Sequence, residues 1–273
     1  MKKFFYTFWI SLYPILIYTG IQVVLGVVIG SFGALIGFDP YLVVDLIKEN
    51  ILLLTTVSAI FSFVFLILFF YFDCRKGRVE KRGNISISDF VMAIIGGAGI
   101  AILLNIIIGL TKLADYDSEF MEVSESLTSP TLMVTLVCAG FIIPIVEEIV
   151  FRGLVFNRIK YQYNYVAAMI ISAFAFGIFH GNMVQGIYAT ILGICLAYVY
   201  NKTKSIFIPI FIHIGANTIV ILYGKLAENE ENILWLLLAI VISLVCAVIG
   251  TVYFIKRKVE RRNEDIEYSG TML

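Results

Sequence analysis

The chain has 273 residues, of which 60% are hydrophobic and 15% are charged. Soluble domains are about 45–50% apolar and about 25% charged, so this composition excludes a soluble globular enzyme, and the abundance of apolar residues excludes an intrinsically disordered chain. The 20 basic and 20 acidic residues balance to a formal net charge of zero, which provides no general attraction to nucleic acid. The composition predicts an integral membrane protein that has the lipid bilayer as its immediate partner.

The hydropathy pattern predicts an all-α, polytopic membrane helix bundle with eight transmembrane helices. A span needs about 20 mostly apolar residues to cross a hydrocarbon core about 30 Å thick. Such segments lie at 4–36, 50–72, 90–111, 131–156, 164–181, 183–200, 206–224 and 233–255. The first segment resembles a signal peptide, but it is too long and no A-x-A cleavage site follows it, so we expect a retained helix.

Basic residues are divided unequally between the two sides of the predicted bundle. Of the 20 Lys and Arg residues, 16 fall on one side, whereas acidic residues gather on the other side at 115–125 and 228–231. Since Lys and Arg favour the cytoplasmic side of short loops, an even number of spans places both termini in the cytoplasm. The short loops and the paired N-terminal lysines are typical of a multi-pass protein of a bacterial plasma membrane.

Five ionisable side chains and one amide remain inside the predicted spans: Glu147, Glu148, Arg152, His180, His213 and Asn217. A charge at the bilayer centre costs about 2.5–3.5 kcal/mol on insertion scales, so such residues persist where they pair, line a watery cavity or perform chemistry. The two histidines are also the only histidines in the chain. This distribution predicts a functional site inside the membrane.

The first motif is formed by Glu147, Glu148 and Arg152. On a helix, Glu148 and Arg152 are four residues apart and share a face, which predicts a buried ion pair. Glu147 is rotated from its neighbour by about 100° and has no cation nearby in the sequence. A desolvated carboxylate of this kind is a candidate general base, so we expect Glu147 to be the reactive group and Glu148 to be its structural support.

Two further motifs follow on later spans. In the second, Phe176 lies one helical turn before His180, where its aromatic ring can fix the orientation of the imidazole. In the third, His213 and Asn217 again lie four residues apart on one face. Both side chains can donate hydrogen bonds, and two such donors on one helical face can hold a developing oxyanion.

These three motifs resemble those of the CPBP family, which joins the type II CAAX prenyl endopeptidases and the bacterial Abi-type intramembrane proteases. That family carries E-E-x-x-x-R, then F-x-x-x-H, then H-x-x-x-N or a close variant, and all three motifs are complete and in order here. The resemblance covers the region 131–220. We therefore expect three parts: N-terminal spans at 1–130, a catalytic core at 131–220, and a last span with a basic cytoplasmic tail at 221–273.

The resemblance implies a membrane-embedded endopeptidase that cleaves peptide bonds without a covalent intermediate. By matched position, Glu147 and His180 would activate a water, and His213 and Asn217 would stabilise the tetrahedral oxyanion. Glu148, Arg152 and Phe176 would support the site. The substrate would be a membrane-associated peptide or the C-terminus of a membrane protein, with peptide maturation or bacteriocin immunity as the biological role.

Other interpretations remain open at this stage. Glu147, His180 and His213 would also provide a two-His, one-carboxylate zinc site. The chain lacks an H-E-x-x-H sequence, so we expect a mechanism that requires no cofactor, with a zinc-dependent protease as the alternative. A non-catalytic membrane scaffold or immunity protein would keep the bundle without the chemistry. Buried Glu and His also occur in ion-coupled transporters, although no inverted repeat is visible.

One geometric difficulty follows from straight helices. At 1.5 Å per residue, Glu147 and His180 would lie at different depths if the fourth and fifth spans began at opposite membrane surfaces. Either the fourth span begins well outside the bilayer or the fifth begins within it. We expect the side chains of Glu147, His180 and His213 to lie around one cavity.

Overall fold

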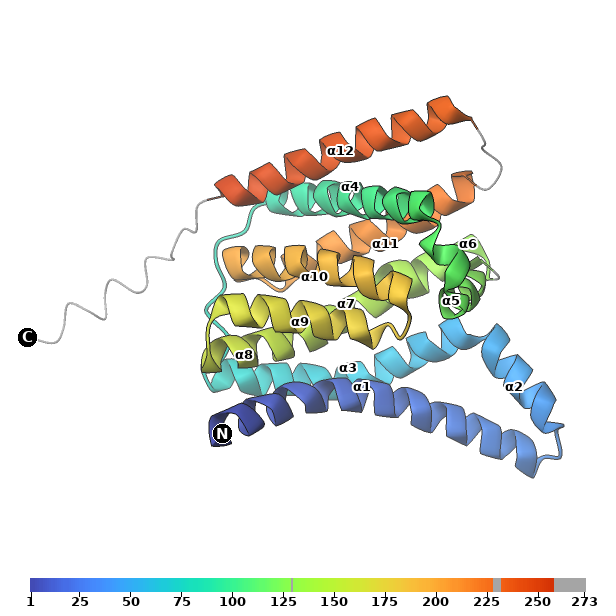
Figure 1. Ribbon diagram of the computed structural model, residues 1–273. Coiled ribbons are helices and arrows are strands. Elements are labelled where there is room, and N and C mark those ends of the chain that lie inside the picture. The colour runs from blue at the N-terminus through green and yellow to red at the C-terminus, as the bar shows by residue number, and fades with distance from the viewer. Residues whose placement is uncertain (129, 228–231, 258–273) are drawn as a thin grey trace, which may run out of the picture.

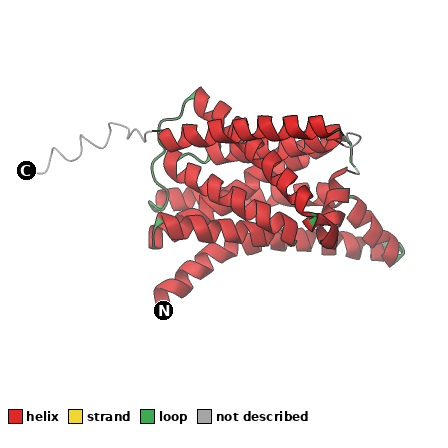
Figure 2. Cartoon of the chain, turned by 45° about the horizontal axis from the view of Figure 1, so that its top comes forward, coloured by secondary structure: helices red, strands yellow, loops and turns green. Residues whose placement is uncertain are grey.

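The computed structural model describes residues 1–128, 130–227 and 232–257, and all regular structure in them is helical (Figure 2). The α-helices are α1 (Lys2–Leu35), α2 (Pro40–Glu49), α3 (Ile51–Arg75), α4 (Ile87–Thr111), α5 (Ser118–Thr128), α6 (Leu132–Thr135), α7 (Ile143–Glu148), α8 (Asn157–Gln162), α9 (Tyr165–Phe179), α10 (Met183–Thr203), α11 (Phe207–Ala227) and α12 (Ile233–Lys256). A 3-10 turn, η1 (Leu113–Tyr116), and two π-helical segments, η2 (Leu136–Ile142) and η3 (Ile149–Phe156), complete the order. The all-α prediction is confirmed.

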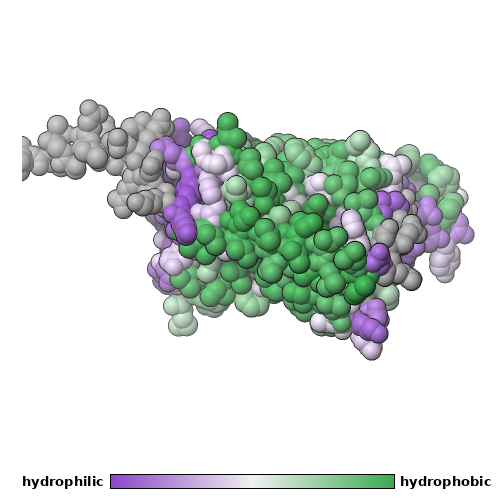
Figure 3. Space-filling view, turned by 90° about the horizontal axis from the view of Figure 1, so that it is seen from above, coloured by the Kyte–Doolittle hydropathy of each residue, from purple (hydrophilic) through white to green (hydrophobic). Residues whose placement is uncertain are grey.

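Seven helical stretches in these described ranges are long and apolar enough to cross a membrane. They are α1, α3, α4, the continuous stretch Leu132–Gln162, α10, α11 and α12. A space-filling view shows a broad hydrophobic belt between two hydrophilic ends (Figure 3). The protein is therefore a multi-pass integral membrane protein. The Lys2 end of α1 and the Lys256 end of α12 lie at the same end of the bundle (Figure 1), and the cytoplasmic location of that end remains a prediction.

The fifth predicted span, at 164–181, is shorter than expected. Helix α9 has 15 residues, which is about 22 Å of helix and less than the thickness of the hydrocarbon core. The Asn164 side chain caps its start by accepting from the Ala167 backbone N–H at 2.9 Å. The helix ends before Gly181, whose φ of +79° lies in the left-handed region that glycine adopts readily. His180 is thereby fixed at the C-terminal end of α9.

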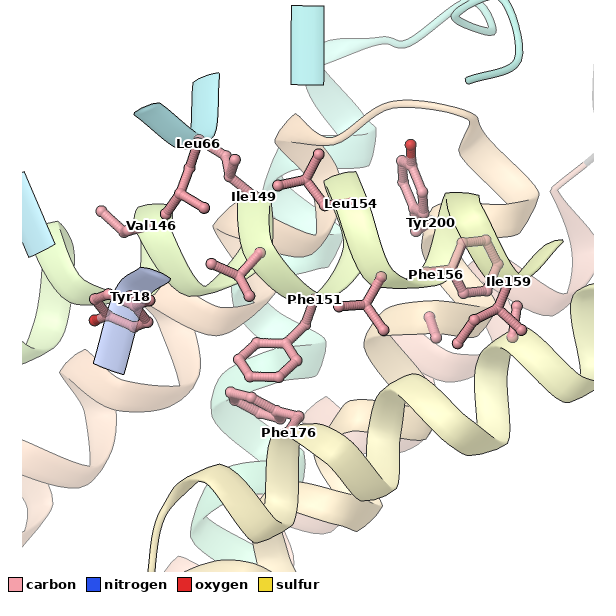
Figure 4. Packing of buried hydrophobic residues seen from close by; sticks show 14 of the residues in the cluster. Tyr18, Leu66, Val146, Ile149, Phe151, Leu154, Phe156, Ile159, Phe176 and Tyr200 are labelled. Atoms are coloured by element: carbon pink, nitrogen blue, oxygen red, sulfur yellow. The ribbon is translucent and has the colours of Figure 1, made fainter. Parts of the chain in front are cut away.

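The stretch Leu132–Gln162 forms the centre of the bundle. Its segments η2, α7 and η3 pack against α3, α9, α10 and α11, while α4 packs against α11 and α12 on one side and α1 packs against α3 on the other (Figure 1). All eight residues of η3 are buried. Their side chains pack on residues of neighbouring helices, including Phe176 of α9 and Leu66 of α3 (Figure 4). The candidate site residues thus lie on the most enclosed helix of the fold.

The central stretch departs from α-helical geometry on both sides of the two glutamates. A π-helix has i→i+5 hydrogen bonds, is rare, and is frequent at functional sites. Asparagine side chains bind backbone carbonyls of both π-helical segments: Asn217 Nδ2 donates to Ala139 O in η2, and Asn157 Nδ2 donates to Gly153 O in η3, each at 2.9 Å. These amides stabilise the irregular backbone within the membrane, where water is not available to do so.

The extended length of the fourth span resolves the conflict in depth. The predicted segment ended at residue 156, whereas the helix continues to Gln162, and only Tyr163 and Asn164 separate it from α9. Glu147 lies 15 residues before Gln162, and His180 lies 15 residues after Tyr165. Because the two helices are antiparallel and share this turn, both residues lie at a similar depth.

Candidate active site

Glu148 joins three helices at the centre of the site. Its side chain is fully buried, and Arg152 Nη1 donates to its Oε1 at 2.7 Å. The ring nitrogen Nδ1 of His213, on α11, lies 2.9 Å from the same oxygen. Arg152 Nη2 also donates to the backbone carbonyl of Gly193 on α10 at 3.2 Å. The buried ion pair predicted from the sequence is therefore present, and it also anchors a catalytic candidate on another helix.

Glu147 lies on the other side of the His213 ring. Its Oε2 is 3.7 Å from His213 Nε2, and only 6% of the residue is exposed. The ring of His213 thus lies between two adjacent carboxylates, one at each nitrogen. Because Glu148 is paired with Arg152, its carboxylate accepts and the His213 Nδ1–H donates. This leaves Nε2 facing Glu147. The sequence-based view that Glu147 has no partner considered its own helix only.

His180 is oriented by two contacts within α9. Its Nδ1 lies 2.8 Å from the backbone carbonyl of Phe176. Because a carbonyl oxygen can only accept a hydrogen bond, Nδ1 carries the hydrogen. The His180 Nε2 is then the acceptor. The Phe176 ring meets the His180 ring edge to face at 4.9 Å between centroids, as the motif predicted.

Phe176 also contacts two residues on other helices. The ring of His213 meets it edge to face at 5.5 Å, and the Arg152 guanidinium lies 4.6 Å from its centroid. Phe151 of η3 packs on the same ring at 5.0 Å (Figure 4). Phe176 therefore contacts both histidines and the arginine of the ion pair, and it sets their positions relative to one another.

Asn217 is placed differently from the expectation. Its amide Nδ2 donates to the Ala139 carbonyl of η2 at 2.9 Å, so the donor that was expected to face an oxyanion binds the backbone of the neighbouring helix. The Nδ1–H of His213 is likewise used by Glu148. One N–H of the Asn217 amide and the Nδ1–H of His213 thus hold the fourth span in place. Because an amide nitrogen carries two N–H groups, the oxyanion role of Asn217 stays a prediction.

The candidate site contains both histidines that the zinc alternative requires. Among the residues that the structure describes, no group of three or more His, Cys, Asp or Glu side chains is placed to hold a metal ion. The Nδ1 atoms of His180 and His213 bind a backbone carbonyl and a carboxylate, and histidines that ligate a metal through Nε2 often make the same contacts. The zinc alternative, Glu147 with the two histidines, therefore stays a prediction.

Gly193 was not singled out by sequence reasoning, although it contributes to the site. A Cβ at this position would lie 3.2 Å from Arg152 Nη2 and 3.1 Å from Ala173 Cα. Glycine therefore allows α10 to approach the ion pair closely enough for its carbonyl to accept from Arg152. A glycine in the middle of an apolar span is the sequence signal for such close helix packing.

Comparison with known proteins agrees with the three motifs. Residues 129–219 match the family model of the Rce1-like type II CAAX prenyl endopeptidases, a region that contains every candidate site residue named so far. This match supports the resemblance of the region to CPBP-type membrane proteases.

An individual relative supports the same assignment. A segment of 87 residues is 34% identical to the putative membrane peptidase YdiL of Bacillus subtilis (strain 168). The similarity covers 32% of this chain and 36% of that relative, so about a third of each protein is compared. No solved structure matches the chain.

Proposed function

We propose that the protein is an intramembrane endopeptidase that uses Glu147 and His180 to activate a water molecule. One observation carries the proposal: the His213 ring lies beside Glu147 and also contacts Phe176, whose ring contacts His180, so that three helices bring these residues into one chain of contacts inside the matched region. Buried acids and imidazoles are unfavourable in a membrane, and their arrangement in one chain of contacts favours chemistry over helix anchoring.

The geometry supports a division of labour in hydrolysis. Glu147 takes a proton from the water while the Nε2 of His180 accepts a hydrogen bond from it, and the water oxygen attacks the scissile carbonyl carbon. The resulting tetrahedral intermediate collapses when Glu147 passes the proton to the leaving nitrogen and the C–N bond breaks. The products are a carboxylic acid and an amine. Glu148 and Arg152 hold His213 against Glu147 during these steps.

The substrate class follows from the location of the site. Glu147 and His213 are buried within membrane-spanning helices, so a peptide must reach them from the lipid or along the helix ends. We therefore propose membrane-associated peptides or the C-termini of membrane proteins as substrates. The family name adds prenylated C-termini as one candidate, and peptide maturation and bacteriocin immunity are candidate biological roles.

The test is cleavage of quenched fluorescent peptides by protein purified in detergent, with and without a farnesylated cysteine near the peptide C-terminus. We expect Glu147→Gln and His180→Ala each to reduce kcat by about 10²–10⁴-fold. Glu122→Gln, an exposed Glu of α5, is the matched control and should retain full activity. Normal cleavage by both site variants would show that the chemistry assigned here is wrong.

Metal dependence is tested in the same assay. The proposed mechanism predicts that a chelator leaves the cleavage rate unchanged and that metal analysis of the purified protein finds no stoichiometric zinc. Loss of activity on chelation, with recovery on addition of zinc, would replace the mechanism with the zinc-dependent alternative.

A further inference from the structure

Tyr18 of α1 lies at the candidate site but outside the region matched by the family model. Its side chain is fully buried, and its ring stacks on Phe179, the residue before His180, with 5.2 Å between centroids. It belongs to the same buried cluster as Val146, the residue before Glu147 (Figure 4). Helix α1 therefore brings one phenol next to the segments that carry the two residues proposed to activate water.

The hydroxyl of Tyr18 has no hydrogen-bond partner among the residues that the structure describes. Buried Tyr hydroxyl groups usually have a partner, and leaving one unsatisfied costs about 1–3 kcal/mol. A phenylalanine at this position would keep the stacking on Phe179 without that penalty. The hydroxyl is thus a buried hydrogen-bond donor that has no acceptor among the described residues.

The site needs such a donor. A tetrahedral intermediate is stabilised by preorganised donors aimed at its oxyanion, and one N–H of the Asn217 amide and the Nδ1–H of His213 already bind Ala139 O and Glu148. The buried donors without a hydrogen-bond partner among the described residues include the Tyr18 hydroxyl and the Arg152 Nε–H. Arg152 is held by Glu148 and Gly193, whereas the Tyr18 ring stacks on Phe179, next to His180.

We propose that Tyr18 donates a hydrogen bond to the scissile carbonyl oxygen and stabilises the oxyanion that forms when water attacks. The hydroxyl proton stays on Tyr18 throughout, so the proton balance of the hydrolysis is unchanged. This inference rests on the proposed peptidase function and adds a catalytic residue to it from the N-terminal helix. The stacking of the buried ring on Phe179 restricts the direction of the hydroxyl before substrate arrives.

The test is Tyr18→Phe, which removes a single oxygen atom, assayed on a quenched peptide that the wild type cleaves. We expect kcat to fall about 10²-fold, as for the loss of one oxyanion donor. Because the interaction exists only in the transition state, kcat/KM should fall equally while KM stays within about twofold. The thermal midpoint should be unchanged or higher, since an unsatisfied buried hydroxyl is removed.

Tyr13→Phe is the matched control on the same helix. The Tyr13 ring contacts Phe69 and the Arg158 guanidinium, both away from the site, and its variant should cleave at the wild-type rate. Cleavage by Tyr18→Phe within about twofold of the wild-type rate would overturn the role assigned to Tyr18. If Glu147→Gln loses cleavage in the same assay, the proposed peptidase function still holds.

Two other results would also decide the matter. A Tyr18→Phe variant with a lower thermal midpoint and a raised KM would show that Tyr18 has a structural role. If the variant instead shifts the acidic limb of the pH–rate profile and leaves the maximum rate unchanged, the hydroxyl acts on Glu147 and not on the oxyanion. Either result overturns the oxyanion role. Cleavage that survives Glu147→Gln would instead overturn the proposed function and, with it, the oxyanion assigned to Tyr18.

Discussion

Glu148 Oε1 and His213 Nδ1 lie 2.9 Å apart although 65 residues separate them in the chain. This contact joins α7 to α11, and Arg152 adds α10 through its hydrogen bond to Gly193. The site is therefore assembled from helices that are distant in sequence, and its geometry depends on one fully buried ion pair. The predictions below test the groups on which that assembly depends.

Replacing Glu148 should affect both stability and catalysis. Glu148→Gln leaves the fully buried Arg152 without its anion, and breaking a buried pair by removing one partner costs about 3–5 kcal/mol. The amide also weakens the hold on His213 Nδ1. We expect a lower thermal midpoint in detergent and a large loss of kcat. A double variant that also carries Arg152→Met should recover stability but not activity, and recovery of both would show that the pair is structural only.

Phe176 should be more important for activity than a neighbouring aromatic of equal burial. Phe176→Leu removes the ring that contacts His180, His213 and Arg152, and we expect kcat to fall by about 10-fold or more through loss of orientation. The control is Phe151→Leu, which changes the packing against the same ring. It should lower the thermal midpoint about as much as Phe176→Leu does, but it should reduce kcat less. Equal kcat values in the two variants would contradict a positioning role for Phe176.

A variant of Asn217 distinguishes its observed hydrogen bond to Ala139 O from the predicted contact with an oxyanion. Asn217→Asp replaces the amide donor that binds Ala139 O with an acceptor, which should destabilise the protein by about 1–3 kcal/mol. The measurement is the thermal midpoint, with Asn232→Asp at the start of α12 as a control, because that cap uses the side-chain oxygen and keeps it. A stable Asn217→Asp variant that is defective only in kcat would favour the expected oxyanion role instead.

Glu80 provides a pH-dependent contribution at the basic end of the bundle. Its carboxylate oxygens lie 2.5 Å from Lys160 Nζ and from Lys204 Nζ. Partial burial acts to raise the pKa of Glu80, but the hydrogen bonds from the two lysines outweigh it, and the pKa lies below its ordinary value of 4.5. A carboxylate with a lowered pKa contributes stability that is present above pH 4.5 and is lost as the pH falls through the folded-state value.

The corresponding measurement is the stability difference between wild type and Glu80→Gln as a function of pH. Since half of the Glu80 side chain is exposed, we expect a difference of no more than about 1 kcal/mol at pH 7, shrinking toward zero below pH 4.5. Glu122→Gln, which changes an exposed Glu of α5, should show no such dependence. A Glu80 effect that is constant from pH 7 to pH 3 would contradict the ion-pair interpretation.

Hydropathy and intramembrane polarity were sufficient to predict much of this molecule. The apolar segments identified the helices, because a bilayer requires long runs of apolar residues, and the ionisable residues inside them identified the candidate site, because each is unfavourable there. The spacing of Glu148 and Arg152 predicted their ion pair for the same reason that it predicts any contact one turn apart on a helix.

The remaining features depend on contacts that local spacing does not encode. The partner of Glu147 comes from α11, the partner of Asn217 is a backbone carbonyl of η2, and Tyr18 belongs to the first helix. The π-helical segments on both sides of α7 also have no signature in the hydropathy pattern. Sequence reasoning therefore selected the candidate groups, but it did not predict most of their contacts.

The most direct test of the central claim is the hydrolysis rate of one cleaved peptide by wild type, Glu147→Asp and Glu147→Gln, measured together with thermal midpoints. If Glu147 activates the water, the aspartate variant keeps a measurable rate because it retains a carboxylate, whereas the glutamine variant loses about 10³-fold or more with an unchanged fold. A folded Glu147→Gln protein that hydrolyses the peptide as fast as wild type would contradict the account.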